Sequence, residues 1–296
     1  MTDDLLMIPG PIEVSPAVTE AFSTEPPSHL APDVIEAFGR SLESMRTVWM
    51  AGEGSQPFVV AGSGTLAMDM AVWNLVDPGE SGLVVNTGYF SDRMADMLER
   101  RGAEVVEVAA EVGAVPELDK VEEAAAQHNF KAMFVTHVDT STGVRTPARK
   151  YADIASRYEM LSVFDGVCAT AAERFEMENW GADLYLTASQ KAIGLPPGLA
   201  LLVASERAMA ARENLGKRPP KSIDFHEWLP IMNAYEARTG SYFATPATNL
   251  VNALDVGLDE ILETDFAGAT GIEARFQLHE NVGEAMRAAW EALGLE

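Results

Sequence analysis

Short runs of apolar, mostly β-branched residues alternate with helical patterns between residues 58 and 205. Seven such runs predict strands: FVVAG at 58–62, GLVVN at 82–86, AEVVEVA at 103–109, AMFVTHV at 132–138, LSVFDG at 161–166, ADLYLTAS at 182–189 and LALLVAS at 199–205. Four segments between them predict helices: 65–76, 89–101, 116–128 and 147–158. This alternation is typical of an α/β domain with a mostly parallel sheet covered on both faces. About ten residues join the last two strands, too few for a helical crossover, which favours an antiparallel pair.

After residue 205 the pattern becomes helical. From about residue 268 to 293, apolar residues recur at helical spacing and predict one long helix with an apolar stripe on one side. The stripe consists of Leu278, Val282, Met286, Trp290 and Leu293. We find neither an internal repeat nor a low-complexity segment.

Acidic side chains outnumber basic ones throughout the chain: 45 Asp and Glu against 21 Lys and Arg give a net charge of -24. Such a surface repels nucleic acid phosphates and anionic lipid, so we expect neither nucleic acid nor membrane as a partner. The lysines are few: Lys120, Lys131, Lys150, Lys191, Lys217 and Lys221. This surface resembles that of proteins from salt-accumulating halophiles, where screening relieves self-repulsion. An ordinary acidic cytosolic protein is the alternative.

Cys168 is the only cysteine, which excludes intramolecular disulfides and cysteine-based zinc sites and suits a reducing compartment. We expect its thiol to be a small core residue, and we expect no metal site. No apolar run approaches the roughly 18 residues that a membrane span needs. The N-terminal segment MTDDLLMIPGP is acidic where a signal peptide is basic. We therefore expect a cytoplasmic protein.

Five of the predicted strands end in residues suited to ligand binding, and open α/β sheets bind ligands at the carboxyl ends of their strands. The first strand ends in Gly62-Ser63-Gly64-Thr65 and runs into a helix, whose N-terminal N–H groups and dipole favour an anion such as phosphate. The second leads to the aromatic rings of Tyr89 and Phe90. The other three end in a group of hydroxyls, a carboxylate and a lysine: THVDTSTG, Asp165 and Ser189-Gln190-Lys191.

Each of these features also has a purely structural interpretation. A Gly-rich turn between a strand and a helix is common, and alone it is a weak signal for phosphate. Asp165 could cap a turn, Phe90 could be a core aromatic residue, and Lys191 could be solvated. We expect His137 to be a hydrogen-bonded structural histidine, since no second metal ligand has suitable spacing. The convergence of these groups on one crevice is what favours a binding site.

A phosphate cradle, an aromatic plane, a buried carboxylate and a crevice lysine are together the parts that hold pyridoxal phosphate. The lysine forms a Schiff base, and the carboxylate keeps the pyridine nitrogen protonated so that the ring accepts electrons. Arginine cannot replace Lys191 here, because only an amine that can lose its proton forms an imine. A NAD site fits less well, because AGSGTLAM at 61–68 lacks the third glycine of the dinucleotide fingerprint.

Four motifs connect the chain to a known family: GSGT at 62–65, THVDTSTGV at 136–144, LSVFDGV at 161–167 and SQKAIGLPPGLA at 189–200. In this order and spacing they resemble the class V pyridoxal phosphate-dependent aminotransferases, in the branch of the alanine–glyoxylate and serine–pyruvate (serine–glyoxylate) aminotransferases. The resemblance runs from IPGPIEVSP at 8–16 to the end of the chain. It implies an α/β fold type I large domain with a mostly parallel seven-stranded sheet between helices. It also implies a homodimer whose active sites are shared across the interface.

The resemblance implies two catalytic residues, Lys191 as the Schiff-base lysine and Asp165 as the partner of the pyridine nitrogen. It further implies that Phe90 stacks on the cofactor ring and that Ser141 lies at the hydroxyl side of the ring. Around the phosphate it places residues of the same subunit and, from the segment SYFATPAT, residues of the neighbouring subunit: Ser63, Gly64, Thr65 and Gln190, and then Tyr242 and Thr245. Some relatives have tryptophan at position 90 and histidine at position 65, so stacking and phosphate contacts can differ here.

The implied reaction transfers an amino group from alanine or serine to glyoxylate or pyruvate in two half-reactions, with the Lys191 amine moving a proton between substrate and cofactor. Two alternatives stay open. A class V lyase such as a cysteine desulfurase needs a cysteine nucleophile, and Cys168, just past Asp165, sits in the wrong place for one. The other alternative is an inactive cofactor-binding subunit that works only as a partner protein.

The resemblance also divides the chain into an N-terminal arm at 1–20, a cofactor-binding large domain at 21–265 and a long helix at 266–296. In the family this helix leads to a small C-terminal domain whose arginine holds the α-carboxylate of the substrate. We expect that domain to be missing, because the chain stops at EALGLE, and Arg275 and Arg287 lie on the helix itself rather than in a matching motif. The expectation is a fragment that binds the cofactor but transaminates slowly. The alternative is a short homologue that recruits another arginine.

Overall fold

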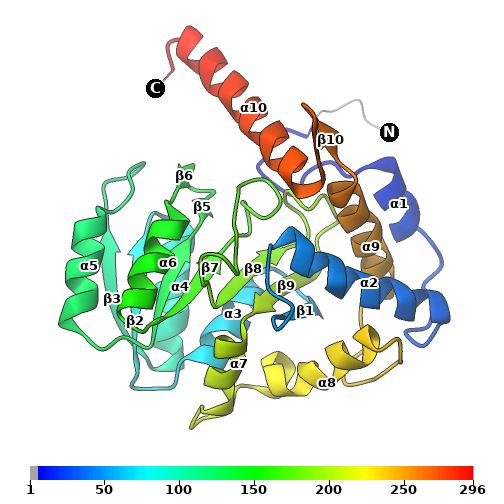
Figure 1. Cartoon of the computed structure of the whole chain (residues 1–296), viewed down its shortest axis with the longest axis horizontal. Helices are drawn as coiled ribbons and strands as arrows, with labels where there is room; N and C mark the ends of the chain where they lie inside the picture. Colours follow the sequence, from blue (N-terminus) through cyan, green and yellow to red (C-terminus); the bar gives the residue numbers. More distant parts are fainter. Residues whose placement is uncertain (1–5, 296) are drawn as a thin grey trace.

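A seven-stranded sheet lies between two layers of helices in the computed structural model, which describes residues 6–295 (Figure 1). The strands, in spatial order, are β1 (Gln56–Ala61), β9 (Leu199–Ala204), β8 (Leu184–Ala188), β7 (Leu161–Asp165), β4 (Ala132–Thr136), β2 (Ser81–Asn86) and β3 (Glu104–Ala109). All seven lie where the apolar runs predict them. The expected α/β fold class is therefore confirmed.

β9 runs antiparallel to both of its neighbours, β1 and β8, whereas the other neighbouring strands are parallel. The antiparallel pairing of the last two predicted strands is thus confirmed. Because β1 and β8 both oppose β9, they point the same way as the rest of the sheet. Six strands therefore end at one edge, and β9 begins there.

Helices cover both faces of the sheet. α3 (Gly64–Leu75), α4 (Tyr89–Arg101) and α7 (Glu206–Glu213) lie on one face, and α5 (Leu118–Gln127) and α6 (Ala148–Arg157) lie on the other. The four predicted helices between the strands are among these five. A strand covered on both faces needs apolar residues throughout, and β4, β7, β8 and β9 are buried along their whole length.

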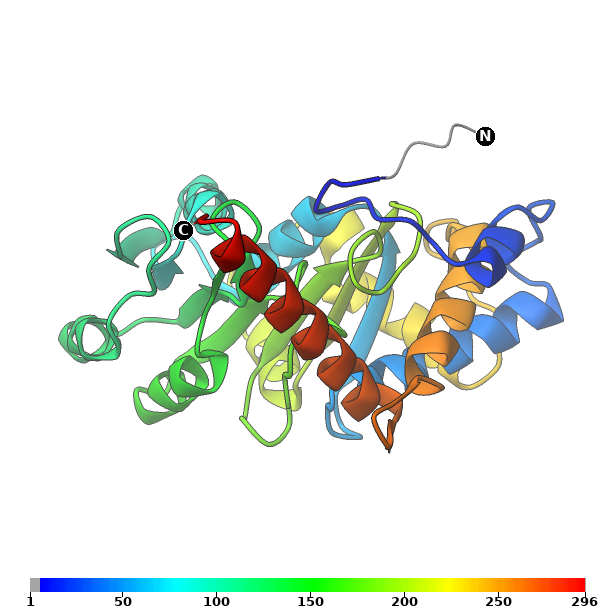
Figure 2. The same ribbon diagram turned by 90° about the horizontal axis from the view of Figure 1, so that it is seen from above.

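A second group of helices packs beyond the β1 edge of the sheet (Figures 1 and 2). It consists of α1 (Pro16–Phe22), α2 (Pro32–Val48), α8 (Phe225–Glu236) and α9 (Thr248–Leu262), with the short 3₁₀ helix η1 (Lys221–Ile223) before α8. Side-chain caps begin two of these helices: Ser15 accepts a hydrogen bond from the N–H of Val18, and Asp224 accepts one from His226. Short polar residues in the loops thus fix where these helices start.

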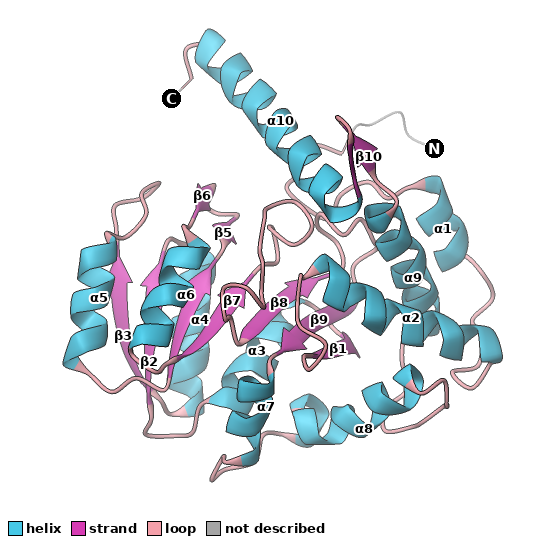
Figure 3. Cartoon of the chain, viewed as in Figure 1, coloured by secondary structure: helices cyan, strands magenta, loops and turns pink. Residues whose placement is uncertain are grey.

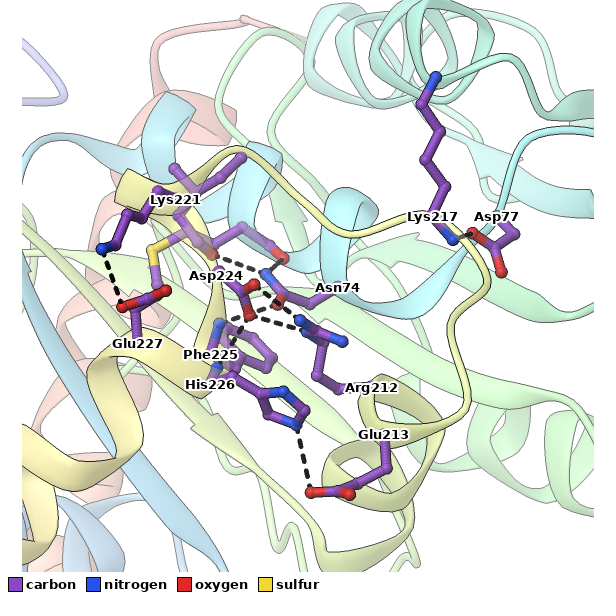
Figure 4. A network of polar contacts seen from close by, with 12 residues as sticks. Asn74, Asp77, Arg212, Glu213, Lys217, Lys221, Asp224, Phe225, His226 and Glu227 are labelled. Carbon is purple, nitrogen blue, oxygen red and sulfur yellow. Dashed lines mark hydrogen bonds and ion pairs between the residues drawn. The ribbon is translucent and has the colours of Figure 1, made fainter.

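The segment between α7 and α8 is fixed to α3 by a polar network (Figure 4). Arg212 donates two hydrogen bonds to the carboxylate of Asp224, at 2.8 and 2.6 Å, and both side chains are buried. Asn74 of α3 donates to the carbonyl of Ile223 and accepts from the N–H of Phe225, at 2.7 and 2.9 Å. The buried charges are therefore paired, and buried backbone groups of this connection have side-chain partners.

The chain ends in a small hairpin and a long helix (Figure 3). The strands β10 (Asp265–Phe266) and β11 (Ala269–Thr270) form the hairpin, and α10 runs over Gly271–Ala292. The predicted helix start near residue 268 is wrong because residues 265–270 turn back on themselves, with Gly268 at a φ of 84°.

α10 crosses above the edge of the sheet where the six strands end (Figures 1 and 2). Its far half carries the predicted stripe, and Val282, Met286 and Trp290 are exposed by 53%, 43% and 48%. The predicted apolar stripe is therefore present, and these three of its side chains are exposed in this chain. Within residues 6–295, no helix combines the length and apolar character that a membrane crossing needs.

Candidate active site

The polar residues expected at the strand ends do lie along one edge of the sheet. Asp165 is the last residue of β7, and Lys191 lies in the turn after β8, the strand next to it. Gly64 begins α3 directly after β1, and Phe90 lies in the first turn of α4, after β2. Parallel pairing of β7 with β4 and β8 brings these chain segments to a common edge.

Lys191 is half-buried in a pocket of about 390 Å³, the size of a small-molecule site. The pocket is lined by Pro9, Ile12, Val138, Asp139, Thr140, Gly143, Cys168, Ala172, Lys191, Ala192 and His279. A larger hollow of about 510 Å³ lies around Asp183 and Arg207, before β8 and after β9 and thus away from the strand ends. The Arg207 guanidinium and the Asp183 carboxylate form an ion pair with each other. Neither charge is therefore free to act on a ligand in this hollow.

The N-terminal segment forms one wall of the Lys191 pocket. The Nζ of Lys191 donates a hydrogen bond of 3.0 Å to the carbonyl of Pro9, and the N–H of Ile12 donates to the carbonyl of Gln190. Gly10 passes so close that a Cβ there would lie 2.5 Å from the Cδ of Lys191. Residues 1–5 of the expected arm, like residue 296 at the other end, lie outside the described residues. The part from residue 6 on is a wall of the pocket.

Asp165 is a buried carboxyl with an unusually high proton affinity. Its side chain is 3% exposed, and Oδ1 accepts a hydrogen bond of 2.9 Å from the N–H of Val167. Burial raises the pKa of Asp165 to about 6, with a further increase from Asp139, while Arg93 and Lys191 act to lower it. A cation beside such a carboxyl, for example a protonated ring nitrogen, stabilises its ionised form.

The connection after β4 folds back as a second small hairpin, β5 (Val138–Asp139) with β6 (Val144–Arg145). Within it, Ser141 donates a hydrogen bond of 2.6 Å to Oδ1 of Asp139, and its Oγ accepts one of 3.0 Å from the N–H of Tyr89. Ser141 thereby links this hairpin to the start of α4, where Tyr89 and Phe90 lie.

The turn between β1 and α3 has the features of a phosphate cradle. Ser63 and Thr65 are exposed on either side of buried Gly64, and Ser63 makes no side-chain cap with α3. A Cβ on Gly64 would lie 2.9 Å from the Val167 side chain, so glycine lets the start of α3 pack closely against the turn after β7. Next to Lys191, the buried Oε1 of Gln190 has no hydrogen-bond partner among the described residues.

Arg93 is a site residue that we did not predict. Its guanidinium donates hydrogen bonds to Oγ1 of Thr65 and to the hydroxyl of Tyr89, at 3.0 and 3.1 Å, and it lies 5.2 Å from the centre of the Phe90 ring. These contacts are with neutral groups, so its positive charge has no carboxylate partner among residues 6–295. In the sequence, the only indication of this role is that Arg93 lies one helical turn after Tyr89. That spacing is too common among helical arginines to identify a site residue.

Two expected phosphate ligands lie elsewhere in this chain. The ring of Tyr242 lies 5.5 Å from that of His29, and Thr245 lines a surface hollow that includes Phe22 and Asn249. Neither residue lines the Lys191 pocket. Among the described residues of one chain, no hydrogen bond or ring contact joins either of them to Lys191, Asp165 or Phe90.

Two further expectations concern Cys168 and His137. Cys168 is half-buried rather than in the core: it lines the Lys191 pocket and contacts the hydroxyl of Thr140, so the expectation of a core residue is wrong. Cys168 lies three residues after Asp165, in the turn that follows β7, and this turn forms part of the pocket wall. His137 is 3% exposed and is hydrogen-bonded to the Tyr185 hydroxyl at 2.9 Å, which confirms a structural histidine.

Comparison with known proteins decides which family this arrangement represents. The family model described as aminotransferase class V matches residues 28–260. The chain belongs to the class V aminotransferases. An alanine–glyoxylate aminotransferase of Saccharomyces cerevisiae is 41% identical over 292 residues, which are 95% of this chain and 74% of that protein. A serine–glyoxylate aminotransferase of Arabidopsis thaliana is 30% identical over 298 residues, 98% of this chain and 71% of that protein.

Solved structures agree with the class V fold. The crystal structure of an alanine–glyoxylate aminotransferase from Nostoc sp. superimposes with a TM-score of 0.92 at 28% identity, covering all of this chain and 76% of that one. Membership of class V implies pyridoxal 5'-phosphate as the cofactor, as the motifs predict. Within residues 6–295, no three His, Cys, Asp or Glu side chains are grouped to hold a metal ion.

The residues at the strand ends fit this cofactor. An amine for its carbonyl carbon, a buried carboxyl for its ring nitrogen and an aromatic ring for stacking are present in Lys191, Asp165 and Phe90. An anion at the start of α3 would meet the helix N-terminus and the unpaired charge of Arg93. The orphaned oxygen of Gln190, beside Lys191, is the kind of buried polar atom that a bound group satisfies.

Proposed function

We propose that this class V aminotransferase transfers amino groups between a small amino acid, alanine or serine, and a 2-oxo acid, glyoxylate or pyruvate. One observation carries the proposal: the amine of Lys191 and the carboxyl of Asp165 stand at the ends of neighbouring strands, beside a glycine turn suited to phosphate. The relatives described above act on alanine and on serine, with glyoxylate as their common substrate by name.

The proposed roles of the residues follow from their chemistry. When bound, pyridoxal phosphate supplies a carbonyl carbon for the lysine amine and a ring that accepts electrons from the substrate. Asp165 holds a proton on the ring nitrogen, because its buried carboxylate gains a cationic partner by doing so. With the cofactor bound, the Nζ of Lys191 would be the base that accepts the proton from the α-carbon of the substrate and the acid that gives it back.

The remaining proposed roles concern position. Ser63, Gly64 and Thr65 hold the phosphate at the start of α3 together with Gln190, and Arg93 adds a positive charge. Phe90 stacks on the ring and Ser141 lies at its hydroxyl side. We propose a homodimer, in which Tyr242 and Thr245 reach the phosphate bound by the partner subunit, since neither reaches the Lys191 pocket of its own chain.

We also propose a cytoplasmic protein adapted to high salt, on the basis of its net charge of -24. Within the chain, we propose that residues 21–265 bind the cofactor, with 1–20 as an arm and 266–296 as the segment that contains the long helix α10. The docking of residues 9–12 against Gln190 and Lys191 supports the assignment of the arm to the site.

The decisive experiment is a single turnover of the purified protein loaded with pyridoxal phosphate. We expect a near-visible absorbance band from lysine-bound cofactor, and we expect alanine or serine to convert that cofactor to its amine form. Lys191→Ala should abolish the band, whereas Lys150→Ala, which changes an exposed lysine of α6, should not. No conversion by any amino acid would leave an inactive subunit, and release of sulfide from cysteine would indicate a lyase. A panel of amino acids with glyoxylate and pyruvate then identifies the substrates.

A further inference from the structure

The first turn of α4 is capped from a distant loop instead of by the residue before it. Gly88 precedes the helix and, having no side chain, forms no cap with it. The N–H of Tyr89 donates instead to Oγ of Ser141, at 3.0 Å, although 52 positions separate the two residues. An oxygen that accepts from a free N–H at a helix start does what an N-cap side chain does. Ser141 is therefore a cap that the β5–β6 hairpin supplies to α4.

Asp139 fixes the direction of this hydroxyl. Its Oδ1 accepts hydrogen bonds from the N–H and from Oγ of Ser141, at 2.9 and 2.6 Å. A serine hydroxyl has a single proton, and this proton is directed at Asp139. The lone pairs of Oγ are therefore left to face the N–H of Tyr89. The backbone carbonyl of Asp139 also accepts from the N–H of Gly143 at 2.8 Å, so the same residue shapes the hairpin turn that carries Ser141.

The carboxylate of Asp139 is buried at the start of the helix that it helps to cap. Its side chain is 0% exposed, and Oδ2 has no hydrogen-bond partner among residues 6–295. A buried charge with an unpaired oxygen is costly. That oxygen lies close to the start of α4, since a Cβ on Gly88 would be 3.0 Å from it. The positive end of the helix dipole stabilises an anion there. Asp139 is thus tied to this turn of α4 both by its charge and through Ser141.

The position of this turn matters because α4 carries two of the proposed cofactor ligands. Phe90 and Arg93 both lie within its first five residues. On its other side the turn is held by Ser91, whose Oγ lies 3.0 Å from Oγ1 of Thr136 in β4. Loss of the contact with Ser141 would therefore shift the start of α4 without unfolding the helix.

We propose that Asp139 is a positioning residue for the cofactor site: by orienting Ser141 it holds the start of α4, and with it Phe90 and Arg93. Asp139 acts through these residues and makes no contact of its own with cofactor or substrate. The inference rests on the proposed roles of Phe90 and Arg93 in holding pyridoxal phosphate.

Hydrogen exchange in the apoprotein tests the contact itself. Mass spectrometry follows the amide hydrogens of residues 87–93 in Ser141→Ala and in Asp139→Ala. Both variants should exchange there about tenfold faster, as expected for the loss of one hydrogen bond to this turn, while α6 should be unchanged. Asp119→Ala is the matched control, because Asp119 is an exposed carboxylate in the first turn of α5. It should leave the exchange of residues 87–93 as it is.

Cofactor binding tests the positioning role. Both variants should raise the dissociation constant of pyridoxal phosphate about tenfold. They should also change the circular dichroism band of the bound cofactor, which reports how its ring is held. Because Asp139 acts through Ser141, the double variant should bind no more weakly than Ser141→Ala alone. Asp139→Asn, whose amide oxygen can still accept from Ser141, should retain most of the affinity.

Four results would overturn the inference. These are unchanged exchange of residues 87–93 in Ser141→Ala, unchanged cofactor affinity in that variant, losses that add up in the double variant, and an Asp139→Asn variant as weak as Asp139→Ala. If Asp139→Ala does not fold, Ser141→Ala and Asp139→Asn still decide, with the affinity of Asp139→Asn compared with that of Ser141→Ala. None of these measurements needs turnover. A protein that responds as expected but converts no amino acid keeps the role of Asp139 and loses the proposed function.

Discussion

The amine of Lys191 lies 3.0 Å from the backbone carbonyl oxygen of Pro9, a residue 182 positions earlier in the chain. The N-terminal segment therefore closes over the reactive amine and is held there by it. A backbone carbonyl accepts a hydrogen bond from the amine without changing its charge. The segment thus covers one side of the amine.

The close passage of Gly10 beside Lys191 leads to a first prediction. Gly10→Ala should displace either the arm or the lysine, because its Cβ would lie 2.5 Å from Cδ and 2.7 Å from Nζ, and its φ of 149° disfavours a side chain. We expect cofactor attachment, followed by stopped-flow absorbance, to slow at least tenfold. Gly113→Ala is the control, since Gly113 has a φ of 87° but open space around it. Equal attachment rates in both variants would contradict this account of the arm.

The unpaired charge of Arg93 leads to a second prediction. Arg93→Ala should raise the dissociation constant of pyridoxal phosphate about tenfold to a hundredfold, the cost of losing a charge-assisted contact. Arg100→Ala is matched, because Arg100 lies on the same helix but is exposed and pairs with Asp96. Fluorescence titration of the apoprotein measures both constants. Arg93 has no part in phosphate binding if the two variants bind the cofactor alike.

The raised pKa of Asp165 leads to a third prediction, about the stability of the apoprotein. A raised carboxyl pKa means that the folded protein binds the proton more tightly than the unfolded chain. This stabilising contribution is present below about pH 4 and is lost as the pH rises through about 6. Asp165→Asn, which can keep the hydrogen bond from Val167, should therefore raise the free energy of unfolding at pH 8 by roughly 3 kcal/mol.

Chemical denaturation of the apoprotein at pH 5 and pH 8 measures this effect, and cofactor-dependent activity should fall in the same variant. Asp183→Asn is the comparison, since Asp183 is also buried but is bonded to Arg207. That variant should lose stability at both pH values, because the arginine loses its carboxylate. A loss of stability at pH 8 in Asp165→Asn would show that the carboxylate is not strained in the empty site.

The net charge of -24 leads to a fourth prediction. The melting temperature should rise from about 0.1 M KCl into the molar range, because screening relieves repulsion between exposed carboxylates. The ion pairs at the surface weaken at the same time, but exposed pairs contribute little each. Differential scanning calorimetry over this range measures the balance. A melting temperature that stays flat or falls would count against adaptation to salt.

The fold and the central pair of site residues could be predicted from the sequence because both depend on local signals. Apolar β-branched runs mark buried strands, and connectivity brings the ends of parallel strands to one edge. Asp165 and Lys191 stand directly after such runs, so locating the strands also located these residues. The hairpin before α10 was missed because the sequence around it resembles the start of the helix. A single glycine, Gly268, allows the chain to turn there.

The remaining parts of the site could not be predicted, because they reach it from distant segments. Pro9 comes from an irregular arm, Arg93 from the side of a helix, and His279 from a helix that crosses the sheet edge. None of them follows a strand, and their types are common on any surface. Cys168 shows the converse: it was assigned to the core as a small residue, yet the turn after β7 carries it along the pocket.

The antiparallel pair of β8 and β9 bears on the order in which the chain folds during synthesis. Ten residues separate these strands, so they can pair as soon as both have left the ribosome, and their turn carries Lys191. β1 must wait much longer, because its partner β9 begins only at Leu199, and loop closure over such a distance is slow. The strand that starts the phosphate turn is therefore unpaired until Leu199–Ala204 has been made, and a chaperone that shields residues 56–61 would protect this nascent protein from aggregation.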